Sequence, residues 1–332
     1  MPHANATILG AGAMGTALGM VLSANKFKVT FWDIEGNVVD AITKKHKNPR
    51  SLKKLELPQT IRAEGSIERA VANADVLIIA VASRAVRDVA MQIADHLPRN
   101  CVIVTVAKGL EGDSLKTMIE VLKEELPANF RNQTFALSGP TLAPEVAEGA
   151  HTAAMIASEK ANAYTKRALS ALSSDWFHVF ETRDVVGVEL SGVGKHVIAV
   201  VSGIMNGLDM PDNTRAWIFT EAFRDVSRLI WKLGGQEQTV YGLAGFGDSV
   251  GTSFAKGSRN RRFGEQLGKG KTPSQAAHVV RETVEGIAAT EAFHKLALRE
   301  KLRLPVLQAV YEVVTLKKNP ETVFAKLIEE LQ

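Results

Sequence analysis

Cysteine is almost absent from this chain, since Cys101 is the single cysteine among 332 residues. One thiol excludes an intrachain disulfide, and no Cys/His spacing typical of a structural metal site accompanies it. Cys101 opens the apolar run 101–106, so we expect a small buried hydrophobic residue there. The sequence therefore predicts no metal site, and it is typical of a protein kept in a reducing compartment.

Long apolar runs and a leader-like start are also lacking. The longest apolar stretch, 197–205, is too short for the roughly 20 residues that a membrane-spanning helix needs. The chain runs directly into a strand-like segment, without the basic start and cleavage pattern of a secretory signal. We expect no integral membrane segment and a cytoplasmic location.

No strong excess of one charge sign is present. The formal net charge is +4, and the Lys and Arg residues are scattered. A nucleic-acid-binding protein usually concentrates its basic residues in a stripe or a tail, so we expect no nucleic acid partner. A mildly basic balance suits small phosphorylated anions instead. The short basic cluster 259–262 is a candidate anion site, and a solvated helix start is its alternative.

The composition is that of an ordinary globular protein, with 45% hydrophobic and 23% charged residues. At roughly 100–200 residues per domain, the length predicts two domains. In the first half, short apolar runs alternate with helical patterns, which predicts crossover units and a doubly wound, mainly parallel sheet of Rossmann type. The expected strands are 6–9, 28–32, 75–81, 101–106 and 134–138, with further candidates at 151–157 and 177–181.

The second half shows helical periodicity and few β-rich runs. The expected helices are 188–203, 215–233, 272–280, 283–299 and 304–315, with glycine-rich turns at 234–235, 242–251 and 268–270. The predicted fold class is α/β, with a dinucleotide-binding domain over 1–184. An all-helical substrate domain over 185–332 follows it.

A glycine-rich segment, Gly10-Ala11-Gly12-Ala13-Met14-Gly15, follows the first expected strand and opens a helix. Glycines at this spacing permit a tight turn, close approach of a pyrophosphate and close packing of helix on strand. The helix N-terminus offers the phosphates free N–H groups and the positive end of its dipole. The segment predicts a dinucleotide site, with a ligand-free turn as the alternative.

Two further segments extend this site. Asp33 ends the second expected strand, where a carboxylate can accept hydrogen bonds from ribose hydroxyls and repel a 2′-phosphate. This favours NAD over NADP as the cofactor, unless Asp33 only caps a loop. Ala80–Ser83 ends a later strand with small residues, so we expect Ser83 near the nicotinamide half, with a plain tight turn as the alternative.

Two lysines stand in unexpected places. Lys108 follows the expected strand 101–106, and Lys195 interrupts the apolar, glycine-rich pattern 187–199. A charged group on such a helix is costly unless it is paired or has a chemical task. The alternative for each lysine is a surface side chain whose stem covers apolar neighbours.

These segments, in this order and spacing, resemble the NAD(P)-dependent glycerol-3-phosphate dehydrogenase family along nearly the whole chain. The matching segments are 10–15, 80–83, 108–109, 138–145, 187–195, 242–248, 258–264 and 284–286. The resemblance implies interconversion of glycerol 3-phosphate and dihydroxyacetone phosphate by hydride transfer with NAD, with NADP as the lesser cofactor. It also implies a homodimer acting on a small phosphorylated substrate.

The resemblance also implies the roles of matching residues. Lys195 corresponds to the general acid/base at the C2 oxygen, Asp248 would orient it, and Lys108 corresponds to a substrate contact. Arg259 and Asn260 correspond to a phosphate-binding pair, and arginine suits a phosphate because its planar fork offers several fixed donors. The other implied substrate-side residues are Gly139, Thr141, His196, Thr252 and Ser258. The implied cofactor-side residues, besides the glycine segment and Asp33, are Ser83, Lys108, Ala143, Arg259 and Glu285.

The chain departs from the family pattern at three places. His196 stands where the family usually has Asn, Ser249 begins an altered stretch after Asp248, and Glu221 stands where the family typically has Arg. These departures leave open the same hydride chemistry on a different small phosphorylated or carboxylated alcohol. A dinucleotide-binding sensor without turnover is a further alternative, and retention of the whole implied catalytic set argues against it.

Overall fold

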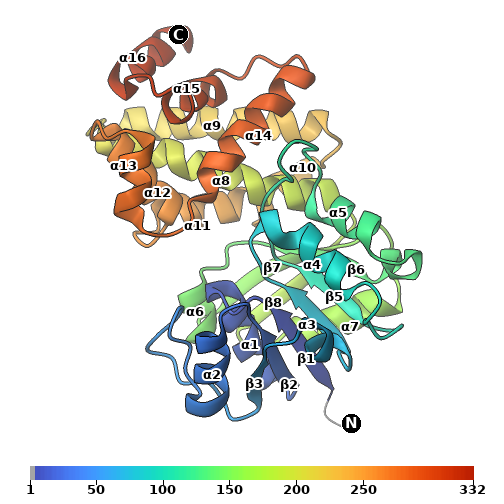
Figure 1. Ribbon diagram of the computed structural model, residues 1–332. Coiled ribbons are helices and arrows are strands. Elements are labelled where there is room, and N and C mark those ends of the chain that lie inside the picture. Colours follow the sequence, from blue (N-terminus) through green and yellow to red (C-terminus); the bar gives the residue numbers. More distant parts are fainter. Residues whose placement is uncertain (1–3) are drawn as a thin grey trace. The chain divides into compact units, whose positions relative to one another are not determined.

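A twisted sheet of eight strands organises the first half of the chain in this computed structural model, which describes residues 4–332 (Figure 1). The strands run in the order β3-β2-β1-β4-β5-β6-β7-β8. Their bounds are β1 (Asn5–Leu9), β2 (Lys28–Trp32), β3 (Ile61–Glu64), β4 (Val76–Ile79), β5 (Val102–Thr105), β6 (Thr134–Ser138), β7 (Thr152–Ala157) and β8 (Phe177–Thr182). All neighbouring pairs are parallel except β6 and β7. The predicted mainly parallel, Rossmann-type sheet is confirmed.

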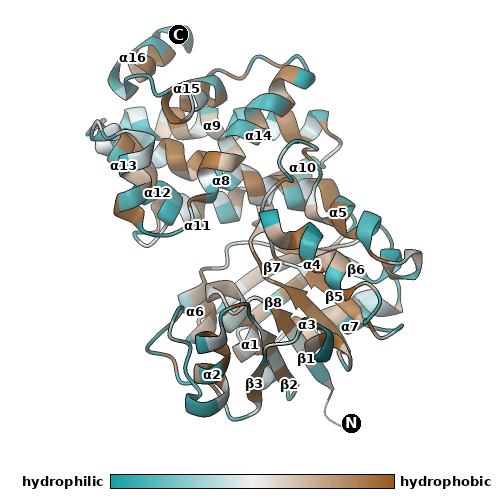
Figure 2. Ribbon diagram, in the orientation of Figure 1, coloured by the Kyte–Doolittle hydropathy of each residue, from teal (hydrophilic) through white to brown (hydrophobic). Residues whose placement is uncertain are grey.

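Helices cover both faces of this sheet. The helices of the first unit are α1 (Ala13–Ala24), α2 (Gly36–Lys45), α3 (Ile67–Val71), α4 (Val86–Ile93), α5 (Met118–Glu125), α6 (Ala143–Ala147) and α7 (Ala163–Leu172). Ile8 and Ile78 point to a core shared with α1, α2, α6 and α7. Leu9 and Ile79, one residue further along, point to a core shared with α3, α4 and α5. Because successive strand residues face opposite layers, both sets must be apolar, as the mainly brown strands in Figure 2 show.

One strand was not foreseen from the sequence. β3 is a short edge strand with the sequence Ile-Arg-Ala-Glu, and only Ile61 is fully buried. Its polar residues hide the strand pattern, and such residues are typical of an exposed sheet edge.

Cys101, immediately before β5, is fully buried, and this burial raises the pKa of its thiol to about 12. The expected burial of Cys101 is therefore confirmed.

The second half is helical, as predicted. Its helices are α8 (Val185–Gly207), α9 (Asp212–Lys232), α10 (Glu237–Val240), α11 (Asp248–Phe254), α12 (Arg259–Gly268), α13 (Pro273–Val280), α14 (Glu285–Arg299), α15 (Pro305–Val314) and α16 (Pro320–Glu330). The two compact units are the chain up to Glu111 with Lys116–Val185, and Gly112–Leu115 with Val186–Gln332. The sequence placed its boundary after residue 184 and assigned all of 1–184 to one domain.

α8 extends well beyond the apolar stretch 197–205, so the helix as a whole is longer than that stretch indicated. It spans 23 residues and is apolar enough, by length and composition alone, to cross a membrane. Within the protein, however, 78% of its apolar window is buried. A buried core helix meets the same length and composition criteria, and the buried Lys195 and Glu189 on α8 are unusual for a lipid-exposed helix.

Glycines let α8 and α12 approach backbone to backbone. A Cβ added at Gly203 would lie 2.0 Å from the carbonyl oxygen of Arg261, and one at Gly264 would lie 2.1 Å from that of Val200. Neither position can carry a larger side chain without forcing the two helices apart. This close contact brings the residues one turn before Val200 and Gly264, which are His196 and Asn260, against each other.

Candidate functional site

The glycine segment after β1 forms the turn that the sequence predicted. Gly10 has a φ of +102°, and an added Cβ there would lie 2.9 Å from the carbonyl oxygen of Ala80. A Cβ at Gly15 would lie 2.1 Å from the carbonyl oxygen of Gly10, because helix and turn pack directly on each other. By contrast, no atom lies within 4 Å of a Cβ built at Gly12. A side chain at position 12 would thus extend into open space instead of meeting the protein.

That open space lies at the N-terminus of α1. Gly12 is the N-cap, Ala13 and Met14 begin the helix, and no acidic residue stands in its first turn. A helix N-terminus of this kind presents unpaired N–H groups and positive potential to an anion. The turn therefore fits a pyrophosphate group, which its residues Gly10–Gly15 would hold.

Asp33, directly after β2, is buried and already engaged by the protein. Its Oδ2 accepts from the backbone N–H of Ala11 at 2.9 Å, and its Oδ1 accepts from that of Glu35 at 3.1 Å. The Arg50 guanidinium donates to both carboxylate oxygens and, at 2.8 Å, to the Glu35 carboxylate. The loop-cap alternative for Asp33 is thus partly correct, since Asp33 does hold the loop.

Arg50 is a residue that the sequence analysis missed. Asn48 positions it: the Asn48 Oδ1 accepts from the backbone N–H of Arg50 at 3.0 Å, while its Nδ2 donates to Ala11 O at 2.8 Å and to Thr16 Oγ1 at 2.9 Å. Asn48 is itself almost fully buried. Neither residue belongs to a motif with fixed spacing, so only the fold reveals that this loop joins the glycine turn.

The remaining predicted cofactor-side residues of the first unit follow the carboxyl ends of β4, β5 and β6, where open α/β sheets bind ligands. Ser83 begins a short 3₁₀ turn after β4, and Gly109 packs against it so closely that an added Cβ would lie 2.3 Å from its Oγ. Lys108 Nζ lies 3.4 Å from the carbonyl oxygen of Gly139, which also accepts from the Thr141 backbone N–H at 2.7 Å. Ala143 begins α6.

In the second unit, Lys195 and Asp248 form a buried ion pair. The Nζ of Lys195 donates to Oδ1 of Asp248 at 2.7 Å, and the two side chains are 9% and 2% exposed. Thr252 Oγ1 donates to the same carboxylate oxygen at 3.3 Å. The surface-lysine alternative for Lys195 is therefore wrong, because its ammonium group and not only its stem is buried.

A π-helical turn places Asp248. The segment expected as a glycine-rich turn, 242–251, is instead a π-helical turn (Leu243–Gly247) that continues directly into α11. A Cβ at Gly245 would lie 1.9 Å from the carbonyl oxygen of Val240, so this tight winding requires glycine. Single π turns often occur at functional sites. Here the residue directly after the turn is Asp248, the first of α11.

Three predicted phosphate-side residues open α12. Ser258 is the N-cap, and its Oγ accepts from the Arg261 backbone N–H at 3.3 Å. Arg259 is 42% exposed and only loosely paired, 3.9 Å from Glu282. Asn260 is buried, and its Oδ1 accepts from the backbone N–H of Gly286 at 2.9 Å. An exposed arginine beside a helix N-terminus is suited to an anion.

Two of the residues that depart from the family pattern, His196 and Glu221, contact other side chains of the second unit. His196 is buried between Asn260, whose Nδ2 lies 2.7 Å from its Nδ1, and Glu285, whose Oε2 lies 3.1 Å from its Nε2. Glu221, on α9, pairs with Arg224 one turn away. Its negative charge is therefore compensated locally.

Comparison with known proteins agrees with this arrangement. Residues 5–164 match the model of the NAD-dependent glycerol-3-phosphate dehydrogenase N-terminus, and residues 184–325 match that of the C-terminus. This chain belongs to the NAD-dependent glycerol-3-phosphate dehydrogenase family.

Curated relatives and a solved structure support this family assignment. A relative named glycerol-3-phosphate dehydrogenase [NAD(P)+] from Anaeromyxobacter sp. (strain K) is 37% identical over 309 residues, 93% of each chain. One of the same name from Clostridium tetani is 35% identical over 93% of this chain and 87% of that relative. The crystal structure of glycerol-3-phosphate dehydrogenase from Coxiella burnetii superposes with a TM-score of 0.92 at 32% identity, covering 98% and 99% of the two chains.

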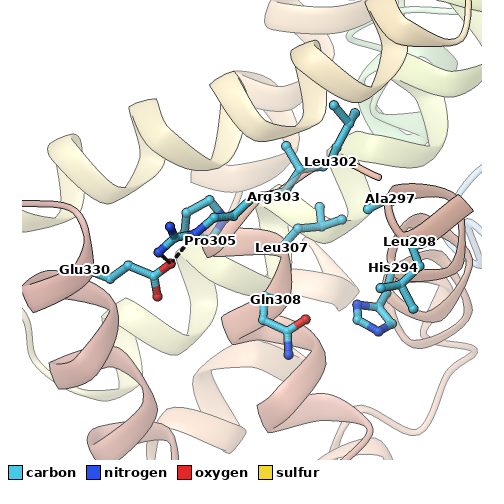
Figure 3. Close-up of a pocket in the computed structure, with 10 residues that line it drawn as sticks. His294, Ala297, Leu298, Leu302, Arg303, Pro305, Leu307, Gln308 and Glu330 are labelled. Atoms are coloured by element: carbon cyan, nitrogen blue, oxygen red, sulfur yellow. Dashed lines mark hydrogen bonds and ion pairs between the residues drawn. The ribbon is translucent and has the colours of Figure 1, made fainter. Parts of the chain in front are cut away.

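A separate pocket in this glycerol-3-phosphate dehydrogenase family member lies away from these residues. It has a volume of about 180 Å³ and lies between α14, α15 and α16 (Figure 3). Its lining residues include His294, Gln308 and the ion pair of Arg303 with Glu330, and none of the predicted site residues. Within residues 4–332, no three His, Cys, Asp or Glu side chains group as metal ligands.

Proposed function

We propose that this chain interconverts sn-glycerol 3-phosphate and dihydroxyacetone phosphate by hydride transfer with NAD(H). The observation that carries the proposal is the buried pair of Lys195 and Asp248 in the same helical unit as Arg259 and Asn260. A buried lysine held by a carboxylate supplies a proton-transfer group, and the α12 N-terminus supplies an anion site. Together they suit a phosphorylated alcohol or ketone.

The dinucleotide, when bound, accepts or supplies the hydride. The residues that hold it in this proposal are the turn Gly10–Gly15 for the pyrophosphate and Asp33 with Arg50 for the adenosine ribose. Ser83, Lys108, Ala143, Arg259 and Glu285 are the further proposed cofactor contacts. The two carboxylates of Asp33 and Glu35 share the one guanidinium of Arg50, so these three side chains together keep a net negative charge. This negative charge disfavours a 2′-phosphate and therefore favours NAD over NADP.

Lys195 is the proposed catalytic acid and base. In the oxidation of glycerol 3-phosphate, the neutral amine form of its Nζ takes the proton from the C2 hydroxyl as the C2–H bond electrons leave with the hydride. The C2–O bond becomes a carbonyl, and Lys195 holds the released proton as an ammonium group. Asp248 stabilises that ammonium group and fixes its direction. In the reverse direction Lys195 returns the proton to the carbonyl oxygen.

The remaining site residues bind and orient the substrate. Arg259 and the second N–H of Asn260 hold the phosphate, with the hydroxyls of Ser258 and Thr252 nearby in the same unit. Gly139, Thr141, Lys108 and His196 complete the proposed substrate set. Because Glu221 is paired with Arg224 and the His196 ring contacts Asn260 and Glu285, neither departure adds an uncompensated charge against a phosphate.

Two further properties belong to the proposal. The single cysteine is compatible with a reducing compartment, so we place the enzyme in the cytoplasm. By analogy with its family, we propose that it forms a homodimer.

The decisive experiment is the oxidation of NADH by purified protein in the presence of dihydroxyacetone phosphate. We expect turnover with this substrate and a smaller kcat/KM with NADPH. Unphosphorylated dihydroxyacetone is the matched control, and its kcat/KM is expected to be much lower because it cannot use Arg259 and Asn260. Turnover with another phosphorylated ketone in place of dihydroxyacetone phosphate would contradict the substrate assignment. NADH binding without turnover on any ketone would contradict the catalytic role.

A further inference from the structure

A chain of polar contacts crosses three helices of the second unit around His196. The backbone N–H of Gly286 donates to Oδ1 of Asn260 at 2.9 Å, and the Nδ2 of Asn260 lies 2.7 Å from Nδ1 of His196. The other ring nitrogen, Nε2, lies 3.1 Å from Oε2 of Glu285. The imidazole ring thus stands between a residue assigned to the substrate phosphate and one assigned to the cofactor.

The contacts determine which ring nitrogen carries the proton. A backbone N–H can only donate, so the atom of Asn260 that faces Gly286 is the carbonyl oxygen. The atom that faces His196 is then the NH₂ group, which also can only donate. Nδ1 must therefore be the bare, accepting nitrogen of a neutral ring, and the proton lies on Nε2 toward the Glu285 carboxylate.

The surrounding packing leaves this arrangement little freedom. His196 and Asn260 are 5% and 6% exposed. At Gly286, an added Cβ would lie 2.6 Å from Val200 Cγ2 and 3.1 Å from Asn260 Oδ1. The backbone contacts between α8 and α12 fix the distance between His196 and Asn260. Turning the amide or the ring would cost a buried hydrogen bond that water cannot replace.

We propose that His196 is a positioning residue that couples the phosphate side of the site to the cofactor side. Through Nδ1 it holds the Asn260 amide so that one Nδ2–H points to the ring and the other remains for the phosphate. Through Nε2, which faces Oε2 of Glu285 at 3.1 Å, it keeps the Glu285 carboxylate directed toward the cofactor by electrostatic attraction. This inference rests on the proposed function, and it assigns His196 an indirect role rather than a direct contact with the substrate.

Two substitutions test the contacts of the two ring nitrogens separately. In His196→Asn the side-chain amide reaches the place of Nδ1 but not that of Nε2, so it can accept from Asn260 and no longer holds Glu285. We expect the KM for NADH to rise about five- to tenfold, from the loss of the polar contact between Nε2 and Glu285, with the KM for dihydroxyacetone phosphate little changed. In His196→Gln the amide reaches toward Glu285, and we expect the opposite pattern. Ser202→Ala, which removes only a bond to Ile198 O on the same helix, is the matched control.

A double-mutant cycle tests the coupling itself. With His196 present, Asn260→Ala and Glu285→Ala should have non-additive effects on the two KM values; in a His196→Ala background the same pair should add. Additive effects in both backgrounds, or equal KM changes in the Asn and Gln variants, would overturn the coupling.

A spectroscopic measurement separates this inference from the proposed function. The ¹⁵N chemical shifts of the His196 ring in the ligand-free protein should show the proton on Nε2, and Asn260→Ala should perturb the Nδ1 resonance. A proton on Nδ1 would overturn the proposal even in an active enzyme. If the protein fails to reduce dihydroxyacetone phosphate while the ring shows the Nε2–H form, the substrate assignment fails and the positioning network stands.

Discussion

Arg50 donates to both carboxylate oxygens of Asp33, the residue expected to read the cofactor ribose. Asp33 therefore does not meet a ligand as a bare carboxylate. Glu35 shares the same guanidinium at 2.8 Å, so cofactor preference depends on the balance of two carboxylates and one arginine. Either partner can be altered separately, which makes the balance testable.

Releasing Arg50 should improve binding of NADPH. In Asp33→Asn the amide oxygen can still accept from the Ala11 N–H, but the charge that holds Arg50 is lost, so the guanidinium becomes available for a 2′-phosphate. We expect the ratio of kcat/KM for NADPH to that for NADH to rise about tenfold or more, and to fall in Arg50→Ala. Lys44→Gln, which removes an exposed lysine paired with Asp40, is the charge-matched control for Arg50→Ala. An unchanged ratio in both variants would mean that Asp33 and Arg50 do not determine the preference between NADH and NADPH.

Replacing the buried Lys195 should abolish most of the turnover and leave NADH binding nearly unchanged. Lys195→Met keeps most of the stem, and we expect kcat to fall by about 10²–10⁴ while NADH binding, measured by fluorescence titration, stays nearly unchanged. Asp248→Asn leaves the Lys195 charge without its buried partner, which should lower stability by about 3–5 kcal/mol as well as kcat. If Lys195→Met lost NADH binding and turnover to the same extent, the lysine would be a structural residue instead.

Two exposed arginines in the first turn of α12 form a matched pair. Arg259 and Arg262 are 42% and 40% exposed, and both lie 3.9 Å from Glu282. We expect Arg259→Ala to raise the KM for dihydroxyacetone phosphate about tenfold or more, because a charge-assisted contact to the phosphate is lost. Arg262→Ala removes the same charge at nearly the same exposure and should change this KM little. Equal effects in both variants would mean a diffuse electrostatic attraction rather than a specific phosphate contact.

A buried carboxylate outside the site should control the pH dependence of stability. Asp225, on α9, accepts from the backbone N–H groups of Val306 and Leu307 at 2.8 and 3.3 Å and so caps α15. Burial, which outweighs these two hydrogen bonds, raises the pKa of Asp225 to about 6. The folded state then binds a proton more tightly than the unfolded state does.

The sign of this linkage follows from the raised pKa. Between the ordinary aspartate pKa and about 6, the folded protein holds the extra proton, so its stability decreases as the pH rises through this window. The loss totals about 3 kcal/mol at neutral pH. In Asp225→Asn this component should be absent, and urea unfolding at pH 4 and pH 7 measures the difference. Asp212→Asn, an exposed position on the same helix, should leave the pH profile unchanged.

Local patterns were enough to predict the fold class and to suggest much of the candidate site. Alternating strands and helices indicated the parallel sheet, and Gly10–Gly15 indicated the turn, because their spacing along the chain is itself the structural requirement. Lys195 was identifiable because a charge in an apolar helix is costly without a partner. Family resemblance added the roles of Asp248, Arg259 and Asn260.

Contacts between distant segments decided the rest. The ion pair of Asp33 with Arg50 depends on a loop that Asn48 holds in place. No periodic pattern in the sequence predicts the position of that loop. A glycine-rich stretch alone does not distinguish an ordinary turn from the π turn before Asp248, in which an added Cβ at Gly245 would lie 1.9 Å from the carbonyl oxygen of Val240. The state of His196 depends on an amide whose direction is set by Gly286, a residue 90 positions away in the chain. Local sequence encodes backbone propensity, whereas hydrogen-bond partners and proton positions are decided only when the helices pack.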